Sequence, residues 1–212
     1  MAWGAIATWR MAHDGVIEAM YLLEKKGKAG DAVETLIKTV EDYPYYKSVG
    51  FGGLPNVEGI LEMDAAFMHG DTFEIGAVAG ITDVKNPISV ARKLSKDKFN
   101  SFRVGEGATK YSMLEGFERK SMLTERAHKI WEKRLKEIQE NNLNPYDGHD
   151  TVGAITLDQM GTMTAGTSSS GLFMKKPGRV GDSPLSGSGF YVDSEIGGAW
   201  VAFRSPWFSF SL

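Results

Sequence analysis

Cysteine is absent from this sequence, which excludes disulfides and thiolate metal sites. The four histidines lack the spacing of metal ligands, so we expect neither a metal nor another cofactor. The formal net charge is −3 and the basic residues are spread along the chain, so we expect no nucleic-acid partner. The first ten residues lack the features of a secretory signal, and no apolar run approaches membrane-spanning length. These absences favour a cytoplasmic protein without membrane contact.

Apolar residues are plentiful enough for one sizeable core, since 42% of the 212 residues are hydrophobic. Helical spacing of apolar residues predicts a helix over 13–26, and Gly27 suits the left-handed position after it. A second helix is predicted from Asp31 until Pro44 ends it, with an apolar stripe of Val33, Leu36, Ile37 and Val40. Further helices are expected from Pro87, through 111–114 and over 124–141, the last being a charged surface helix.

Strands are predicted between and after these helices. A short apolar run at 3–8 suits a buried strand, and 60–81 alternates with period two on both sides of a turn. A third short run lies at 102–104. From residue 151 onward the pattern is all strand, with a hairpin formed by 151–157 and 162–169. Helices and strands are therefore mixed in this chain.

The junction at 148–157 places a candidate nucleophile at the start of a strand. A polar loop that ends in Asp150 turns directly into the apolar run that Thr151 opens. If the chain were cut before Thr151, that residue would carry both a hydroxyl and a free amine. The amine is a base able to accept the hydroxyl proton near neutral pH. The alternative interpretation is that Asp150 and Thr151 form an ordinary entry into a strand.

Two glycine-rich segments are further candidates for a ligand site. The segment 48–56 is a shaped loop in which glycine permits close backbone approach. The segment 178–193 carries Arg179 and Asp182, and loops of this kind hold polar side chains against a ligand. Taken alone, this pair has an alternative interpretation as a surface ion pair that stabilises the fold by less than about 1 kcal/mol.

Four motifs together resemble the glycosylasparaginase family of N-terminal nucleophile (Ntn) hydrolases, and the resemblance extends from Trp3 to about Ala199. The motifs are His149-Asp150-Thr151-Val152-Gly153, Gly178-Arg179-Val180-Gly181-Asp182-Ser183-Pro184, Ser48-Val49-Gly50-Phe51-Gly52-Gly53 and Asn86-Pro87-Ile88-Ser89-Val90-Ala91-Arg92. The resemblance implies an α+β fold, the four-layer αββα sandwich with two mainly antiparallel sheets between helical layers. It also implies an amidohydrolase that cuts itself before Thr151 and hydrolyses the amide between N-acetylglucosamine and asparagine.

The resemblance implies roles for residues around the cut. Thr151 is the nucleophile, both in self-cleavage of the Asp150–Thr151 bond and in catalysis. Ser169 stands where the family has a threonine whose hydroxyl supports the nucleophile. Ser48 matches a loop serine near the nucleophile, and we assign His149 no catalytic role.

The resemblance also implies a binding site for a small substrate, a glycosylated asparagine or a β-aspartyl compound. Arg179 matches the residue that binds the substrate's α-carboxylate, for which a guanidinium fork is suited. Asp182 matches the group that receives the α-ammonium. Trp9 matches a tryptophan that lines the pocket, with core packing as its alternative. The family further implies a homo-oligomer of cleaved heterodimers.

The sequence departs from the family pattern near its C-terminal end. Where the family has a Thr-Gly pair that forms the oxyanion site, this chain has Ala202 and Phe203. We therefore expect 1–150 to be the α-chain part, 151–199 the start of the β-chain and 200–212 a divergent tail, with the C-terminal part of the family fold missing. The alternatives to glycosylasparaginase activity are an inactive truncated or frameshifted homologue, and an asparaginase or β-aspartyl peptidase.

Overall fold

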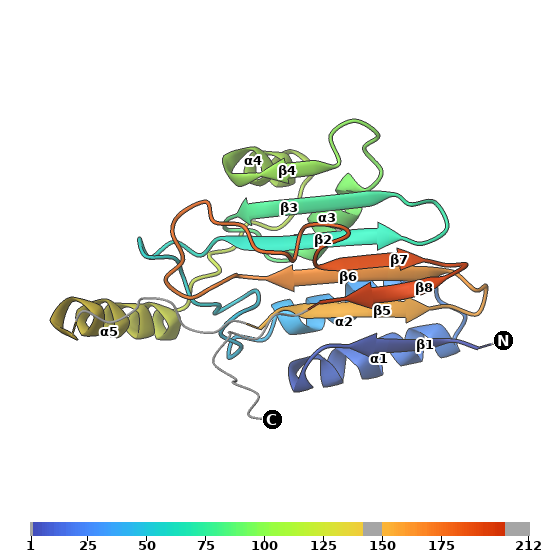
Figure 1. The fold of residues 1–212 in the computed structure, drawn as a ribbon, viewed down its shortest axis with the longest axis horizontal. Helices are drawn as coiled ribbons and strands as arrows, with labels where there is room; N and C mark the ends of the chain where they lie inside the picture. Colours follow the sequence, from blue (N-terminus) through green and yellow to red (C-terminus); the bar gives the residue numbers. More distant parts are fainter. Residues whose placement is uncertain (1, 142–149, 202–212) are drawn as a thin grey trace, which may run out of the picture.

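A six-stranded sheet runs through the protein, whose computed structural model describes residues 2–141 and 150–201. The strand order is β1-β5-β6-β2-β3-β4 (Figure 1). Neighbouring strands are antiparallel, except that β3 and β4 are parallel. The strands are β1 (Gly4–Ala7), β2 (Met63–His69), β3 (Ile75–Ile81), β4 (Phe102–Val104), β5 (Val152–Leu157) and β6 (Met163–Ser169).

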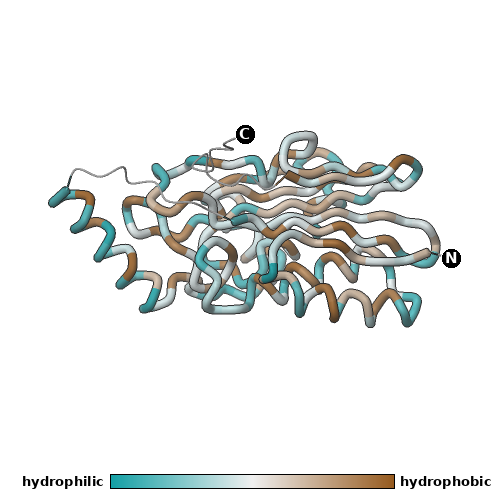
Figure 2. The backbone as a smooth tube through the Cα atoms, turned by 60° about the horizontal axis from the view of Figure 1, so that its bottom comes forward, coloured by the Kyte–Doolittle hydropathy of each residue, from teal (hydrophilic) through white to brown (hydrophobic). Residues whose placement is uncertain are grey.

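A layer of helices covers one face of this sheet (Figure 2). It consists of α1 (His13–Glu24), α2 (Ala29–Glu41) and α3 (Pro87–Leu94). The predicted apolar stripe of α2 is fully buried against the sheet, because helical spacing places its members on one side. Helix α4 (Gly105–Leu114) packs on β3, and α5 (Glu125–Asn141) projects beyond the end of the sheet in Figure 1.

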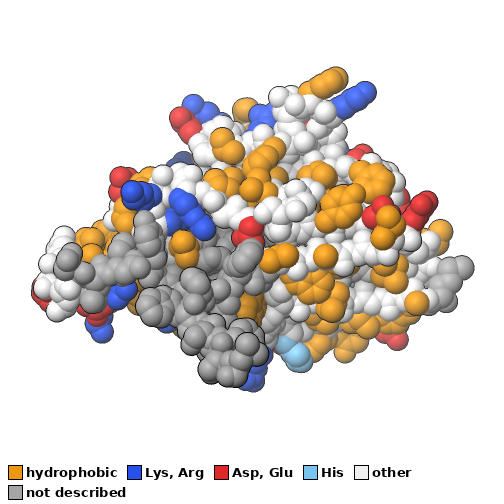
Figure 3. Space-filling model, viewed as in Figure 1, with side chains coloured by type: hydrophobic (Ala, Val, Ile, Leu, Met, Phe, Trp, Pro, Cys, Tyr) orange, Lys and Arg blue, Asp and Glu red, His pale blue; other side chains and the backbone are white. Residues whose placement is uncertain are grey.

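The other face of the sheet carries a two-stranded hairpin of β7 (Phe190–Asp193) and β8 (Gly197–Trp200). A second apolar cluster lies beneath it, formed by Ala66, Met68, Ala77, Ile155, Ala165, Phe190 and Val192. Strands β2 and β6 are therefore buried on both faces. In Figure 3, which shows this face, hydrophobic side chains gather over the half where Figure 1 places β1, β7 and β8. This mixture of sheet and helix layers confirms the predicted α+β fold.

The expected helices and strands are present, with two corrections. The run at 3–8 was expected to be a buried strand, but β1 lies at the edge of the sheet and Ile6 is 57% exposed, because β1 has a partner strand on one side only. The second correction concerns the residues after α1. Lys26, not Gly27, adopts the left-handed conformation, with φ at 63°. Glycine is needed at 27 for a different reason, because a Cβ there would lie 2.7 Å from the carbonyl oxygen of Leu22. The Gly27 amide donates to that same oxygen at 2.8 Å, so the close approach ends the helix.

Several expectations fall at or beyond the limits of the described residues. Trp200, expected to begin a divergent tail, pairs with Phe190 in the β7–β8 hairpin. The positions of Ala202 and Phe203, and the loop position of His149, lie outside the described residues. Over 2–141 and 150–201, the structure contains no helix both long and apolar enough to cross a membrane. In the same residues, no group of three or more histidine or carboxylate side chains is placed to hold a metal.

Candidate active site at the start of β5

Thr151 lies immediately before β5 and is almost fully buried, with 3% of its surface exposed. Thr8, which follows β1, holds this strand start in place. Its hydroxyl lies 2.8 Å from the Thr151 carbonyl oxygen, to which it donates, and it accepts from the Gly153 amide at 2.9 Å. The backbone on both sides of Val152 is therefore fixed by one side chain, and so is the direction in which Thr151 points.

Ser183 is the hydrogen-bond partner of the Thr151 hydroxyl. The two hydroxyl oxygens are 3.1 Å apart, and both side chains are buried. The Ser183 carbonyl oxygen in turn accepts from the Thr167 hydroxyl on β6 at 2.6 Å. The glycine-rich loop that contains Arg179 and Asp182 thus contacts the candidate nucleophile through Ser183, the residue after Asp182.

Ser169 and Ser48 meet beside the same strand ends. The Ser169 hydroxyl accepts from the Gly171 amide at 2.9 Å, and the Ser48 carbonyl oxygen accepts from the Ser170 amide at 2.7 Å. Ser48, Gly171 and Asp150 also line one cavity of about 160 Å³. The structure therefore brings Ser169, Ser48 and the residue before Thr151 together around the end of β6. The Ser169 hydroxyl bonds to Gly171, whereas the Thr151 hydroxyl bonds to Ser183.

Arg179 and Asp182 form no ion pair with each other in the part of the chain that the structure describes. Instead, Arg179 Nη1 and Asp182 Oδ2 are buried atoms without a hydrogen-bond partner among the described residues. The guanidinium folds over its own loop, because a Cβ built on Gly181 would lie 3.2 Å from Nη1. The surface ion pair therefore does not form. The buried Arg179 donor and the buried Asp182 acceptor remain available to a ligand.

Trp9 has an unusual backbone conformation beside the site. Its φ of 63° and ψ of 154° fall in a region that is populated almost only by glycine, and such conformations cost about 1–3 kcal/mol. Its side chain is 38% exposed, so it does not serve as core packing. Because Trp9 directly follows Thr8, the strain is located one residue from the clamp on Thr151.

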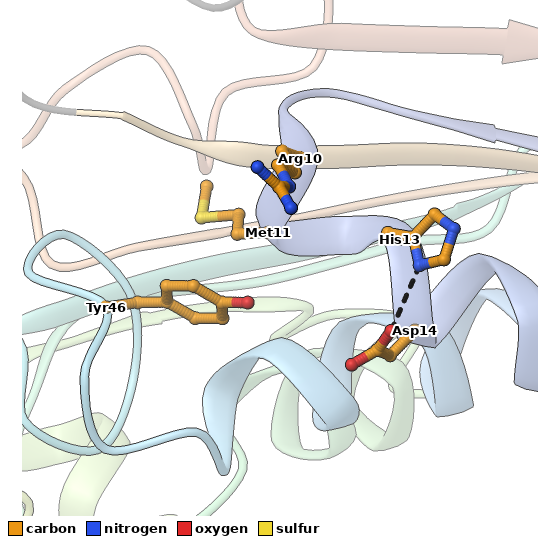
Figure 4. A pocket seen from close by; sticks show the side chains of 5 residues that line it. All are labelled: Arg10, Met11, His13, Asp14 and Tyr46. Atoms are coloured by element: carbon orange, nitrogen blue, oxygen red, sulfur yellow. Dashed lines mark hydrogen bonds and ion pairs between the residues drawn. The ribbon is translucent and has the colours of Figure 1, made fainter.

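A pocket of about 430 Å³ opens beside the turn that follows Trp9 (Figure 4). Its lining residues are Arg10, Met11, His13, Asp14 and Tyr46. His13 Nδ1 and Asp14 Oδ1 are 3.0 Å apart, and the Tyr46 hydroxyl points into the space between Arg10 and Asp14. Burial raises the pKa of Tyr46, with the Asp14 carboxylate acting in the same direction. The tyrosine thus offers a neutral hydroxyl at neutral pH.

Sequence reasoning did not identify two of these residues, Thr8 and Ser183. Ser183 lies within a motif that the resemblance used, immediately after Asp182, so its position was an available signal. Thr8 is 143 residues from Thr151, and only the pairing of β1 with β5 brings them together.

Comparison with known proteins gives consistent matches. The model of the asparaginase family matches residues 6–201. The N(4)-(Beta-N-acetylglucosaminyl)-L-asparaginase of Elizabethkingia miricola is 40% identical over 194 residues, which are 92% of this chain and 57% of that protein. The plant-type L-asparaginase of Pyrococcus abyssi is 42% identical over 187 residues, covering 82% of this chain and 60% of that protein. The isoaspartyl peptidase/L-asparaginase of Mus musculus is 36% identical over 183 residues, covering 85% and 56% respectively. The chain thus spans less than two thirds of each of these relatives.

Proposed function

Because the chain belongs to the asparaginase family, we propose that it is an amidohydrolase of the glycosylasparaginase type with Thr151 as its nucleophile. The observation that carries the proposal is the hydrogen bond between the Thr151 and Ser183 hydroxyls. It joins the candidate nucleophile directly to the loop with the unpaired guanidinium and carboxylate atoms of Arg179 and Asp182.

The first proposed step is cleavage of the chain before Thr151. The Thr151 hydroxyl attacks the Asp150 carbonyl carbon, the C–N bond breaks, and the acyl group is left on the threonine oxygen as an ester. The released nitrogen takes the proton and becomes the α-amine of Thr151. Water then opens the ester, which leaves Asp150 with a carboxylate and Thr151 with a free hydroxyl. The proposed cut thus divides the chain into 1–150 and 151–212, with 151–199 as the start of the β-chain and 200–212 as its divergent tail.

The second proposed step uses the new α-amine as the base. It accepts the hydroxyl proton while the oxygen attacks the side-chain amide carbon of a substituted asparagine. The leaving amine takes up a proton, a β-aspartyl ester remains on Thr151, and water releases L-aspartate. Arg179 binds the substrate's α-carboxylate in this scheme, and Asp182 binds its α-ammonium.

Three neighbouring residues have supporting roles in the proposal. Ser169 and Ser48 stabilise the strand ends beside the nucleophile through their contacts with Gly171 and Ser170. Trp9 lines the entrance, and the pocket that begins at Arg10 receives the leaving group. Assembly of the cleaved chains into a homo-oligomer belongs to the same proposal, and light scattering of the purified protein measures it.

Intact-mass measurement tests the cleavage step. The wild-type protein is expected to give two fragments that divide at Asp150, whereas Thr151→Ala is expected to remain whole. A wild-type chain that stays at its full mass after prolonged incubation would reject self-cleavage.

Substrate assays test the reaction and separate the related activities. N-acetylglucosaminyl-asparagine, L-asparagine and a β-aspartyl dipeptide are compared under the same conditions, with Thr151→Ala as the control. We expect the highest rate with the glycosylated substrate. A higher rate with one of the others assigns the alternative activity, and no turnover above the control with any substrate identifies an inactive homologue.

A further inference from the structure

Asp64 is a buried carboxylate at the start of β2, close to the candidate site. It pairs with Ser169 across β2 and β6, and its side chain points toward the β7–β8 face because its neighbours Met63 and Ala65 face the helices. Its Oδ1 accepts from the Gly80 amide at 2.8 Å. Burial raises the pKa of Asp64, whereas the Lys175 ammonium and the Gly80 and Gly181 amides lower it. The carboxylate therefore lies close to both Lys175 and the loop at Gly181.

Lys175 is buried as well, with 1% of its side chain exposed. Its ammonium is 3.7 Å from Glu62 Oε2 and 3.5 Å from the Glu62 carbonyl oxygen. A Cβ built on Gly171 would lie 3.1 Å from Lys175 Nζ and 3.6 Å from Arg179 Nη1. Burying an ammonium is costly unless carboxylates compensate it, so this placement beside a second cation indicates a specific role.

The Glu62 carboxylate holds the backbone next to Arg179, and Asp64 lies near the same loop. Glu62 Oε1 accepts from the Gly178 amide at 2.9 Å, one residue before Arg179. The Gly181 amide lies close enough to Asp64 to lower the pKa of that carboxyl, two residues after Arg179. Lys175 compensates the charge of Glu62, which it faces directly. Its ammonium also opposes the rise that burial causes in the pKa of Asp64.

We propose that Lys175, with Glu62 and Asp64, is a positioning residue that fixes the Gly178–Gly181 backbone and so aims the Arg179 guanidinium at the substrate's α-carboxylate. The inference rests on the proposed function, in which Arg179 binds that carboxylate. Lys175 itself does not touch the substrate, since its side chain is closed off from solvent. Removing its charge leaves the Glu62 carboxylate, whose side chain is only 13% exposed, without its counter-ion, and the loop that Glu62 holds loses its fixed position.

The test replaces Lys175 with methionine in the full chain and compares it with Lys176→Met. Lys176 is the next residue, carries the same charge and is exposed, so it controls for net charge and local sequence. Amide hydrogen exchange of Gly178 and Gly181, measured by NMR, reports on the loop without any need for activity. We expect Lys175→Met to speed both amides by about tenfold or more and Lys176→Met to leave them unchanged. Unchanged exchange in Lys175→Met would overturn the proposal.

Affinity for L-aspartate, the acyl product of the proposed reaction, is the second readout. Calorimetry is expected to show binding weakened by about tenfold to a hundredfold in Lys175→Met and wild-type affinity in Lys176→Met. A wild-type protein that does not bind L-aspartate would contradict the proposed role of Arg179 and Asp182. The exchange measurement would still decide the role of Lys175, so the two failures are distinguishable.

Two further variants keep the proposal testable if Lys175→Met does not fold. Glu62→Gln retains an oxygen for the Gly178 amide but removes the charge that faces Lys175, and faster exchange at Gly178 and Gly181 is expected. Lys175→Arg retains the charge and is expected to preserve both protection and L-aspartate affinity. Wild-type exchange in Glu62→Gln would overturn the proposal.

Discussion

Glu41, the last residue of α2, is a fully buried carboxyl beneath β6. It accepts from the Ser168 hydroxyl at 2.7 Å, from the Ile88 amide at 3.1 Å and from the Asn86 side chain at 3.3 Å. Burial raises the pKa of Glu41 to about 8, although these hydrogen bonds oppose the shift. One side chain thus joins α2, the start of α3 and the strand next to Thr151, and it does so in its neutral form at neutral pH.

This raised pKa makes folding stability depend on pH. Below about pH 4.5, Glu41 is protonated in both the folded and the unfolded states, and its contribution is fully present. As pH rises toward about 8, the unfolded state gives up the proton that the folded state retains, so the free energy of unfolding falls. Glutamine does not ionise in this range, so Glu41→Gln removes the difference in proton binding between the folded and the unfolded states. We expect the variant to gain stability relative to wild type, on the order of a few kcal/mol, between pH 5 and 8.

Urea unfolding of both proteins at several pH values measures this difference. Glu18→Gln makes the same change at an exposed position on α1 and is expected to leave the pH dependence as in the wild type. A constant difference between Glu41→Gln and wild type from pH 5 to 8 would show that Glu41 does not exchange its proton on unfolding.

At the scale of elements, α1 and α2 approach closely at Gly15. A Cβ built there would lie 2.4 Å from the Leu36 carbonyl oxygen, a backbone atom that cannot rotate away. Gly15→Ala is therefore expected to destabilise the fold by about 1–3 kcal/mol through overpacking. Urea denaturation measures the change.

Gly107 in α4 is the matched control for this substitution. A Cβ on Gly107 would meet nothing within 4 Å, and its φ is not positive. Gly107→Ala is expected to stabilise the protein by about 0.5–1 kcal/mol, because alanine has the higher helix propensity. Stabilisation by both substitutions would mean that helix propensity, and not the contact between α1 and α2, decides the effect at Gly15.

Much of the element structure was predictable because its causes are local. The stripe of α2 follows from helical spacing, and the β2–β3 hairpin follows from period-two alternation. Alternation also places Asp64 and Phe67 on opposite faces, but it does not reveal that both faces are covered. The buried Asp64 carboxyl lies close to Lys175 and Gly181, which belong to a loop more than 100 residues further along the chain. The burial of Lys175 likewise depends on Glu62, with which no sequence pattern connects it.

At the scale of the whole molecule, the candidate site forms where segments distant in sequence meet at one end of the sheet. The motif around Thr151 identified the nucleophile candidate because it is contiguous. Its partners Thr8 and Ser183 come from the end of β1 and from the loop before β7. Their contacts with Thr151 required the strand order β1-β5-β6, which local patterns do not determine.

The two apolar layers, one on each face of the sheet, are expected to unfold as a unit. They share β2 and β5, whose side chains enter both cores alternately, so neither layer retains its packing without the other. Phe190 tests this expectation because it is 2% exposed in the smaller cluster, whereas its neighbour Tyr191 is 45% exposed. Phe190→Ala is expected to cost about 3–5 kcal/mol and Tyr191→Ala less than about 1 kcal/mol.

The measurement is urea unfolding of Phe190→Ala followed by both tryptophan fluorescence and far-ultraviolet circular dichroism. Because Ser183 and the loop of Arg179 precede β7 directly, a hairpin that melted alone would release the candidate site while the helix-covered core stayed folded. In that case the two probes would give separate transitions. Shared strands predict instead that both transitions shift together to lower urea, so the candidate site would persist only as long as the whole sheet does.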